Sequence, residues 1–116
     1  MRRLVLAFIL SAGPAFSEGL EIQVVGETAN GTIKIDLFED VAPLHVAQIT
    51  TLAAGGKYNG VVLHRVIPGF MAQTGDVKFG KDPSDMSMAG RGGSDLPNVT
   101  AEFSNVPVDR GVVGMA

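Results

Sequence analysis

The chain has 116 residues, of which 46% are hydrophobic and 18% charged, so it fits one small domain and a multi-domain protein is excluded. Lys and Arg total 9 against 12 for Asp and Glu, a net charge of -3, without the basic excess that phosphate-backbone binding requires, so we expect no nucleic acid partner. The absence of cysteine excludes disulfide scaffolds, thiolate zinc sites and thiol nucleophiles.

The N-terminus has the features of a secretory signal peptide in their usual order. Residues 1–3 are positively charged, residues 4–10 form an uninterrupted apolar run, and residues 15–17 have the small-x-small pattern of a cleavage site just after Pro14. A core strand or helix at the N-terminus is the alternative interpretation. The apolar run is far shorter than the ~20 residues that span a bilayer, so we do not expect a membrane anchor.

We therefore expect a cleaved leader over residues 1–17 and a mature domain over residues 18–116. Cleavage would remove two arginines and make the product more acidic. An exported chain without cysteine is typical of the periplasm of a Gram-negative bacterium, and full secretion is the alternative location.

The first elements of the mature domain are a predicted hairpin and a predicted helix. Residues 22–25 and 32–38 are rich in β-branched side chains, and the second run alternates apolar with polar residues, which predicts two strands joined by residues 26–31. Apolar residues at helical spacing predict a helix over residues 42–54, with Asp40 as its N-cap, Pro43 in its first turn and glycines after its end.

The second half of the domain contains short apolar runs and many turn residues. Residues 61–67 and 70–73 predict two strands with a turn at Pro68–Gly69, and residues 74–98 predict a long loop. We also expect strands at 99–103 and 112–116, with a turn over 107–111. Mostly strands with one early helix predict a mainly β fold, either a β-barrel or a small α+β sheet.

Arg65 is the most unusual residue of this pattern, because it lies within an otherwise apolar strand. A guanidinium is rarely buried without a partner. Arg65 therefore either forms a structural ion pair or faces a ligand, and composition alone leaves both interpretations open.

Residues 58–75 resemble the signature of the cyclophilin family of peptidyl-prolyl cis-trans isomerases. That signature has an aromatic residue, then a His-Arg pair, two aliphatics, a Phe followed by an aliphatic, a Gln and a Gly. The matching residues are Tyr58, His64, Arg65, Val66, Ile67, Phe70, Met71, Gln73 and Gly75. Leu63 departs from the pattern, since the family usually has Phe before the His-Arg pair. The resemblance extends over nearly all of the mature domain.

The resemblance implies a cyclophilin-like antiparallel β-barrel with a capping helix. Family members close an eight-stranded barrel with two helices, and this chain resembles the N-terminal two thirds of it, stopping inside a strand. We therefore expect a fold that is C-terminally incomplete and lacks part of the proline-binding pocket. The site residues implied by the match are Arg65 and Gln73 as catalytic residues, and Phe70, Met71 and Ala116 as substrate-binding residues.

The implied reaction requires no nucleophile, metal or cofactor. Rotation about an Xaa-Pro amide passes through a twisted state at a cost of ~20 kcal/mol, and no bond is made or broken. A catalyst has only to bind the twisted amide better than the planar forms. Arg65 would donate a hydrogen bond to the prolyl nitrogen, Phe70 and Met71 would contact the pyrrolidine ring, and Gln73 would hold the substrate backbone and orient Arg65.

Turn chemistry tests whether these residues can share one face. A two-residue turn would place Arg65 opposite Ala72, and Met71 and Gln73 would then lie on the opposite face of the hairpin from Arg65. Pro-Gly favours a type II turn, which twists against a tight hairpin, so we expect a three-residue connection over residues 68–70. Arg65 then lies opposite Gln73, with Met71 beside it.

Other candidate sites have weaker support. His45 and His64 with Asp36 or Asp76 could form a metal site, but no two of them have ligand spacing. We expect no metal, and we expect His64 to point away from the site and pack in the core or behind Arg65.

Two functional classes follow from the sequence. The first is an exported, monomeric prolyl isomerase that acts on proline-containing peptides and unfolded exported proteins. The second is a non-catalytic fragment or binding module that holds proline-containing segments without turning them over.

Overall fold

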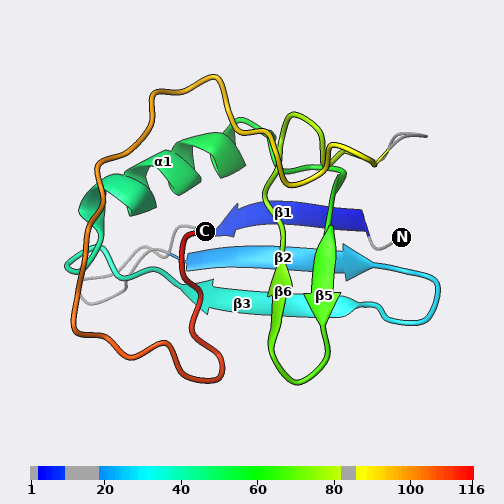
Figure 1. Ribbon diagram of the computed structural model, residues 1–116, viewed down its shortest axis with the longest axis horizontal. Helices are drawn as coiled ribbons and strands as arrows, with labels where there is room; N and C mark the ends of the chain where they lie inside the picture. Colours follow the sequence, from blue (N-terminus) through cyan, green and yellow to red (C-terminus); the bar gives the residue numbers. More distant parts are fainter. Residues whose placement is uncertain (1–2, 10–18, 82–85) are drawn as a thin grey trace.

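The computed structural model describes residues 3–9, 19–81 and 86–116 of the chain. They form a four-stranded sheet in the order β3-β2-β1-β4, a separate two-stranded sheet β5-β6, and one helix (Figure 1). The elements are β1 (Arg3–Ile9), β2 (Gly19–Val25), β3 (Gly31–Asp36), α1 (Pro43–Ala54), β4 (Val61–Val62), β5 (Arg65–Ile67) and β6 (Met71–Gln73). A mainly β fold with one helix is thus confirmed.

The predicted first hairpin is formed by β2 and β3. The two strands pair antiparallel from Gly19↔Asp36 to Val24↔Gly31, and the Gly26 N–H donates a 3.1 Å hydrogen bond to Asn30 Oδ1 in the connection. β2 begins three residues before the predicted start, because the ladder continues to Gly19.

Strand β1 occupies the position between β2 and β4 and is antiparallel to both. It pairs with β2 from Arg3↔Val25 to Ile9↔Gly19, and with β4 at Arg3↔Val62 and Leu4↔Val61. This strand falls within the predicted leader. Cleavage of the leader stays a prediction, and the predicted cleavage site lies outside the described residues.

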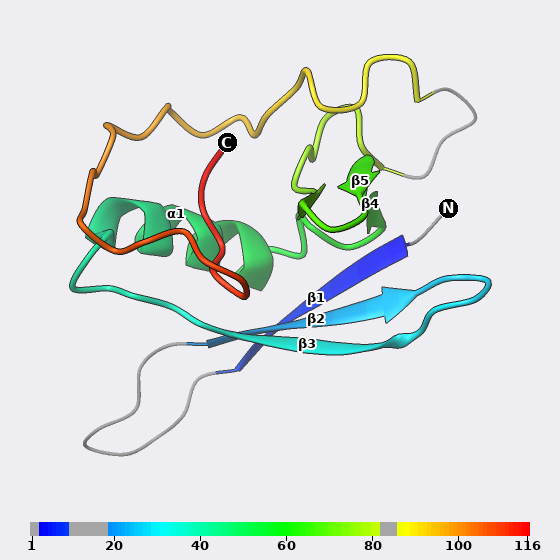
Figure 2. The same cartoon turned by 60° about the horizontal axis from the view of Figure 1, so that its bottom comes forward.

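Helix α1 lies on one face of the four-stranded sheet (Figure 2). The main core cluster joins Leu20 and Ile22 of β2 to Leu52 and Ala53 of α1, together with Tyr58 just beyond the helix. Burial raises the pKa of the Tyr58 hydroxyl to about 12. The aromatic that begins the family-like motif is therefore a core residue. Within the described residues, no helix combines the length and the apolar character that crossing a membrane requires.

The helix begins at Pro43, one residue after the predicted start, and Asp40 is not its N-cap. The N-cap position is Ala42, which provides no side-chain cap. Asp40 lies in a preceding turn in which the N–H groups of Val41 and Ala42 donate to the Phe38 carbonyl. Because this turn comes between Phe38 and the helix, Asp40 lies two residues before the N-cap position.

The predicted strand over residues 61–67 is divided between the two sheets. Val61 and Val62 are 0% and 2% exposed and belong to β4, whereas β5 begins at Arg65. The Val62 N–H donates to the Gly80 carbonyl at 2.8 Å, and Val61 bridges to Lys81. Residues 63–64 are therefore the point at which the chain leaves one sheet for the other.

The predicted strands at 99–103 and 112–116 are wrong. Residues 86–116 are all described, and none of them joins a ladder. This segment passes around the N-terminal end of α1 as irregular chain (Figure 2). The turn within 107–111 is confirmed, since the Val112 N–H donates to the Asp109 carbonyl at 3.0 Å.

Candidate functional site

The β5–β6 hairpin places Arg65 directly opposite Gln73. Register pairs Arg65 with Gln73 and Ile67 with Met71, which leaves three residues in the connection. Gly69 has φ +76, and the Phe70 N–H donates to the Ile67 carbonyl at 3.0 Å, as in a type II turn. The predicted three-residue connection is confirmed.

Alternation along the two strands decides which side chains share a face. Arg65 and Ile67 lie on the same face as Met71 and Gln73, and residues 66 and 72 lie on the other. Arg65 is exposed, whereas Met71 and Gln73 are half-buried. The structure thus brings together three of the predicted site residues: a cationic donor, an amide and a flexible apolar side chain.

The side chain of Arg65 is exposed and is not paired with a carboxylate among the described residues. In the part of the chain that the structure describes, Arg65 has no ion pair. The interpretation of Arg65 as a structural ion-pair residue therefore has no support. An exposed arginine on a half-buried face is free to donate hydrogen bonds to a ligand.

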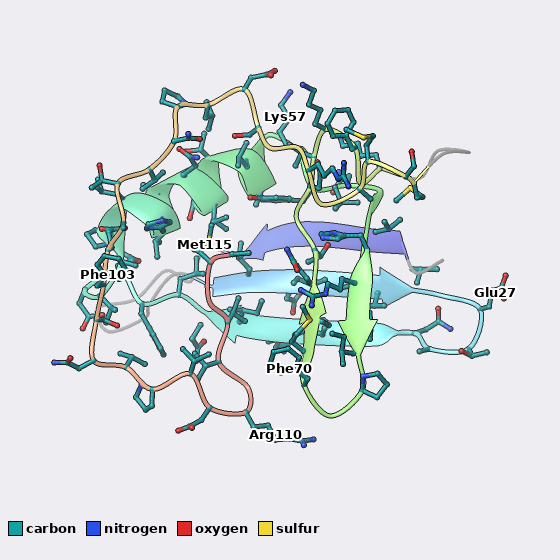
Figure 3. All side chains as sticks on the ribbon, viewed as in Figure 1. Glu27, Lys57, Phe70, Phe103, Arg110 and Met115 are labelled. Atoms are coloured by element: carbon teal, nitrogen blue, oxygen red, sulfur yellow. The ribbon has the colours of Figure 1, made fainter. Side chains whose placement is uncertain are left out.

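Phe70 and Ala116 are less closely associated with this face. Phe70 lies in the turn with 75% of its surface exposed, and Ala116 is exposed at the end of the described chain. Figure 3 shows Met115, the neighbour of Ala116, well separated from Phe70. The structure therefore does not bring Ala116 to the hairpin residues.

A buried carboxylate fixes the chain that follows the hairpin. Asp76 is 4% exposed. Its Oδ1 accepts hydrogen bonds from the N–H groups of Lys78 and Phe79 at 3.0 and 2.9 Å, and its Oδ2 accepts from those of Gly90 and Gly92 at 2.7 and 3.0 Å. Burial alone would raise the pKa of this carboxyl, but the four hydrogen bonds outweigh burial and lower the pKa below its ordinary value.

The glycine-rich loop held by Asp76 rests on the histidine that precedes Arg65. A Cβ at Gly90 would lie 2.9 Å from His64 Nε2, and a Cβ at Gly92 would lie 2.8 Å from Asp76 Oδ1. Both distances are too short for a side chain. His64 is half-buried, and its Nδ1 is buried without a hydrogen-bond partner. His64 therefore packs against the glycine-rich loop at Gly90.

The end of β6 is also tied to the larger sheet. The Thr74 hydroxyl donates a 2.9 Å hydrogen bond to the Val62 carbonyl of β4. Thr74 follows Gln73 directly, and Asp76 lies two residues later. Hydrogen bonds on both sides of Gly75 thus limit the orientations available to the hairpin that carries Arg65 and Gln73.

A second carboxylate supplies the missing helix cap. Glu102 accepts hydrogen bonds from the N–H groups of Leu44 and His45 at 3.1 and 2.8 Å, and it contacts His45 Nδ1 at 2.6 Å. Burial would raise the pKa of Glu102, but the hydrogen bonds from His45 and Leu44 and the charge interaction with His45 lower it. His45 is thus occupied by a carboxylate, and the described residues contain no group of three potential metal ligands.

Sequence reasoning missed the roles of Asp76 and Glu102. Asp76 was considered only as a metal ligand, yet a Gly-Asp pair before a glycine-rich stretch is a signal for side-chain-to-backbone hydrogen bonding. Glu102 has no comparable local signal, because the amides that it caps lie 57 and 58 residues earlier in the chain.

Comparison with known proteins points to one family. Residues 22–116 match the family described as "Cyclophilin type peptidyl-prolyl cis-trans isomerase/CLD". A "Probable peptidyl-prolyl cis-trans isomerase" of Brucella suis biovar 1 is 53% identical over 98 residues, which cover 83% of this chain and 50% of the relative. A "Peptidyl-prolyl cis-trans isomerase-like 1" of Aspergillus fumigatus is 41% identical over 73 residues, 63% of this chain and 40% of the relative.

A third relative matches a shorter stretch. The "Peptidyl-prolyl cis-trans isomerase" of Synechococcus elongatus is 47% identical over 53 residues, which cover 46% of this chain and 37% of the relative. The chain thus spans about half the length, or less, of these curated relatives. No solved structure matches it significantly.

Proposed function

The chain belongs to the cyclophilin-type peptidyl-prolyl cis-trans isomerase family, and we propose that its protein accelerates the cis-trans isomerisation of Xaa-Pro bonds. The observation that carries this proposal is the pairing of Arg65 with Gln73 on a face that also holds Met71. The proposed substrates are proline-containing segments of unfolded exported proteins, and the proposed location is the periplasm or the cell exterior.

The proposed mechanism uses the change in the prolyl nitrogen during rotation. In the planar amide its lone pair is delocalised, and in the twisted amide it becomes a hydrogen-bond acceptor. Arg65 can donate to that lone pair only in the twisted state, so the interaction lowers the barrier rather than stabilising the substrate. Gln73 holds the substrate backbone, while Met71 and Phe70 contact the proline ring.

The proposed fold of the whole protein is a cyclophilin-like antiparallel barrel with capping helices. The described sheets, with α1 on one face, support this proposal by their strand content and by the family match. In such a barrel a second wall would exclude water from Arg65, and a donor in a drier site stabilises developing charge or a lone pair more strongly.

A binding module is the second candidate function. The observation in its favour is the openness of the hairpin: Arg65 is exposed and Phe70 is 75% exposed. An open face can hold a proline-containing segment, but its hydrogen bonds compete with water. Such a face would bind the ground state about as well as the twisted state, which gives no rate enhancement.

Exchange NMR on a proline tetrapeptide tests the proposal. We expect a protein of the relatives' length to speed cis-trans exchange, and Arg65→Ala to slow it about a hundredfold, because losing one preorganised donor costs ~3 kcal/mol. Arg110→Ala is the matched control, since Arg110 is an exposed arginine outside the hairpin that carries Arg65. Peptide binding without acceleration would establish the binding module instead, and an undiminished rate in Arg65→Ala would remove Arg65 from the mechanism.

A further inference from the structure

Charge is distributed unevenly along the chain. Residues 57–91 have three acidic residues and five basic ones, which are Lys57, Arg65, Lys78, Lys81 and Arg91. By contrast, residues 18–56 and 92–116 together have nine acidic residues and two basic ones. The segment that contains the β5–β6 hairpin is therefore positive and lies between two acidic stretches. A surface of one sign attracts groups of the opposite sign, so this segment favours negatively charged ligands.

The exposed charge of this segment is more positive than the count of residues suggests. Asp76 is buried, and its two oxygens accept hydrogen bonds from four backbone N–H groups. The other two acidic residues, Asp82 and Asp85, lie outside the described residues. All five basic side chains are exposed, and none of them forms an ion pair within the part of the chain that the structure describes. These cations are therefore accessible to a ligand.

Arg91 is held next to the hairpin through the residue that precedes it. A Cβ at Gly90 would lie 2.9 Å from His64 Nε2, so the glycine-rich loop contacts this histidine directly. Arg65 follows His64 in the chain, and Arg91 follows Gly90. Each of the two exposed arginines is thus one residue away from the same contact, one on the hairpin and one on the loop (Figure 1).

Lys78 adds a second cation to the loop. Asp76 accepts hydrogen bonds from the N–H groups of both Lys78 and Gly92, and a Cβ at Gly92 would lie 2.8 Å from the Cβ of Lys78. Because Gly92 follows Arg91, the side chains of Lys78 and Arg91 start from neighbouring backbone positions. The Lys78 ammonium lies 5.0 Å from the centroid of the Phe79 ring. This contact positions the ammonium and leaves N–H groups for a carboxylate. Lys78 and Arg91 are called the loop cations below.

We propose that the loop cations bind an acidic side chain of the substrate, so that the protein acts preferentially on prolines with an Asp or Glu nearby in the sequence. This inference rests on the proposed isomerase function and adds a substrate class to it. Arg65 and Gln73 act on the prolyl bond, whereas the loop cations contact the flanking chain, which extends by about 3.3–3.6 Å per residue. The contact is the same for the planar and the twisted amide, so it lowers KM and leaves kcat unchanged.

Other anionic partners fit this charge distribution less well. Nucleic acids and anionic lipid surfaces attract a protein through many charges at once. Such extended surfaces would also repel the acidic stretches on both sides of residues 57–91. A single carboxylate on a peptide that already lies on the hairpin requires only the two loop cations.

Exchange NMR with paired proline peptides tests this preference. The peptides of one pair differ only in a Glu or a Gln three residues before the proline, and a second pair has the same difference three residues after it. We expect the Glu peptide of at least one pair to have a KM about two- to fivefold lower at low salt, as for exposed ion pairs, with the same kcat. At 1 M salt, where charges are screened beyond about 3 Å, the KM ratio should return to about one.

Two double variants with the same change in net charge separate the loop cations from the overall charge. Lys78→Gln/Arg91→Gln should bring the KM values of the Glu and Gln peptides together. Lys34→Gln/Arg110→Gln is the matched control, since both positions are exposed and lie outside residues 57–91, and it should keep the difference. Lys78→Glu/Arg91→Glu should reverse the preference, so that a Lys peptide binds better than the Glu peptide. Because each readout is a ratio for one protein, a smaller folded fraction does not change it.

The outcomes distinguish this proposal from the proposed function. A KM difference that is lost in the loop variant and kept in the control supports the proposal. Equal KM values for the Glu and Gln peptides, or a difference that both double variants reduce equally, would overturn it. Dissociation constants from NMR titration of the same peptides decide the preference even if no peptide isomerises faster, a result that would defeat the proposed function alone.

Vesicles of phosphatidylglycerol and phosphatidylcholine test the membrane as the alternative partner. We expect no binding that depends on the loop cations, because the acidic stretches oppose attachment to an anionic surface. Vesicle binding that is lost in Lys78→Gln/Arg91→Gln, together with equal KM values for the paired peptides, would assign the loop cations to a membrane surface and overturn the proposal.

Discussion

Asp76 shows how one buried side chain can hold together the chain segments that lie behind the candidate site. Its two oxygens are fully used by four backbone N–H groups, and no cation balances its charge among the ion pairs of the described residues. Hydrogen bonds to a charged acceptor are stronger than neutral ones, which accounts for the stability of a buried carboxylate here. The glycine-rich loop is held over His64 as a result.

We expect Asp76→Asn to destabilise the protein by on the order of 1–3 kcal/mol, because the amide group turns one of the two acceptor atoms into a donor that faces N–H groups. Thermal unfolding followed by circular dichroism measures the effect. Asp95→Asn is the control, since Asp95 is exposed. Equal melting temperatures for the two variants would show that the four hydrogen bonds contribute little.

The same carboxylate predicts a pH dependence. The hydrogen bonds from four backbone N–H groups lower the pKa of Asp76 in the folded protein below its ordinary value, so ionised Asp76 stabilises the fold above the unfolded-state pKa. This stabilisation is lost as the pH falls from the unfolded-state pKa through the lower folded-state pKa. We expect the melting temperature to decrease over that acidic range, with a smaller decrease in Asp76→Asn.

At the residue scale, the sequence predicted the contacts that depend on local turn chemistry. Pro68–Gly69 fixed the three-residue connection and with it the Arg65–Gln73 pair, because proline and a left-handed glycine select one turn type. Asp76 was harder to predict because two of its partners lie 14 and 16 residues away. All four partners of this carboxylate are backbone N–H groups, which every residue except proline has. No basic residue in the sequence therefore marks the position of the interaction.

Among the elements, α1 depends on a distant residue for its N-terminus. The first N–H groups of a helix have no partner within it, and Ala42 at the N-cap cannot provide one. Glu102 does so from the segment that passes around this end of the helix, and its negative charge also favours the positive end of the helix dipole.

We expect Glu102→Gln to lower the thermal stability of the chain and to speed hydrogen exchange at the amides of Leu44 and His45, because the substitution removes the charge and one acceptor atom. Glu27→Gln is the matched control, since Glu27 lies in the exposed connection between β2 and β3 (Figure 3). Exchange at Leu44 and His45 that stays as slow as in the unmodified chain would contradict the capping role.

Elements with a strong local pattern were predicted, and elements that depend on pairing were not. The helix and the β2–β3 hairpin have clear periodicity and turn residues. Residues 99–103 and 112–116 are apolar enough to form strands, yet a strand requires a pairing neighbour, and these residues join no ladder. The division of residues 61–67 between two sheets likewise depends on Gly80 and Lys81, far along the sequence.

On the scale of the whole molecule, the leader is the largest prediction still to be tested. We expect cleavage near Ser17 on export, because the charged, apolar and small-residue regions occur in the order that signal peptidases recognise. Mass spectrometry of the periplasmic protein should give an N-terminus within a few residues of Glu18. A cytoplasmic protein that retains Met1 would contradict both the leader and the location.

The whole molecule also exposes large apolar side chains. Phe103, Val108 and Phe70 are 95%, 77% and 75% exposed, and exposed apolar surface of this kind favours association. We expect residues 1–116 alone to melt with low cooperativity and to isomerise peptides weakly, compared with a protein of the relatives' length. Circular dichroism melting and peptide exchange on both forms measure this, and a sharp melt with full activity in the short form would show a complete miniature isomerase.

The distance in sequence between α1 and its cap has a consequence for synthesis on the ribosome. Leu44 is translated 58 residues before Glu102, which at about 5–20 residues per second takes roughly 3–12 s. During that interval the first turn of α1 lacks the carboxylate that completes it. The nascent chain thus emerges with the first turn of α1 still prone to fraying, and this end of the helix is completed only after Glu102 has been translated.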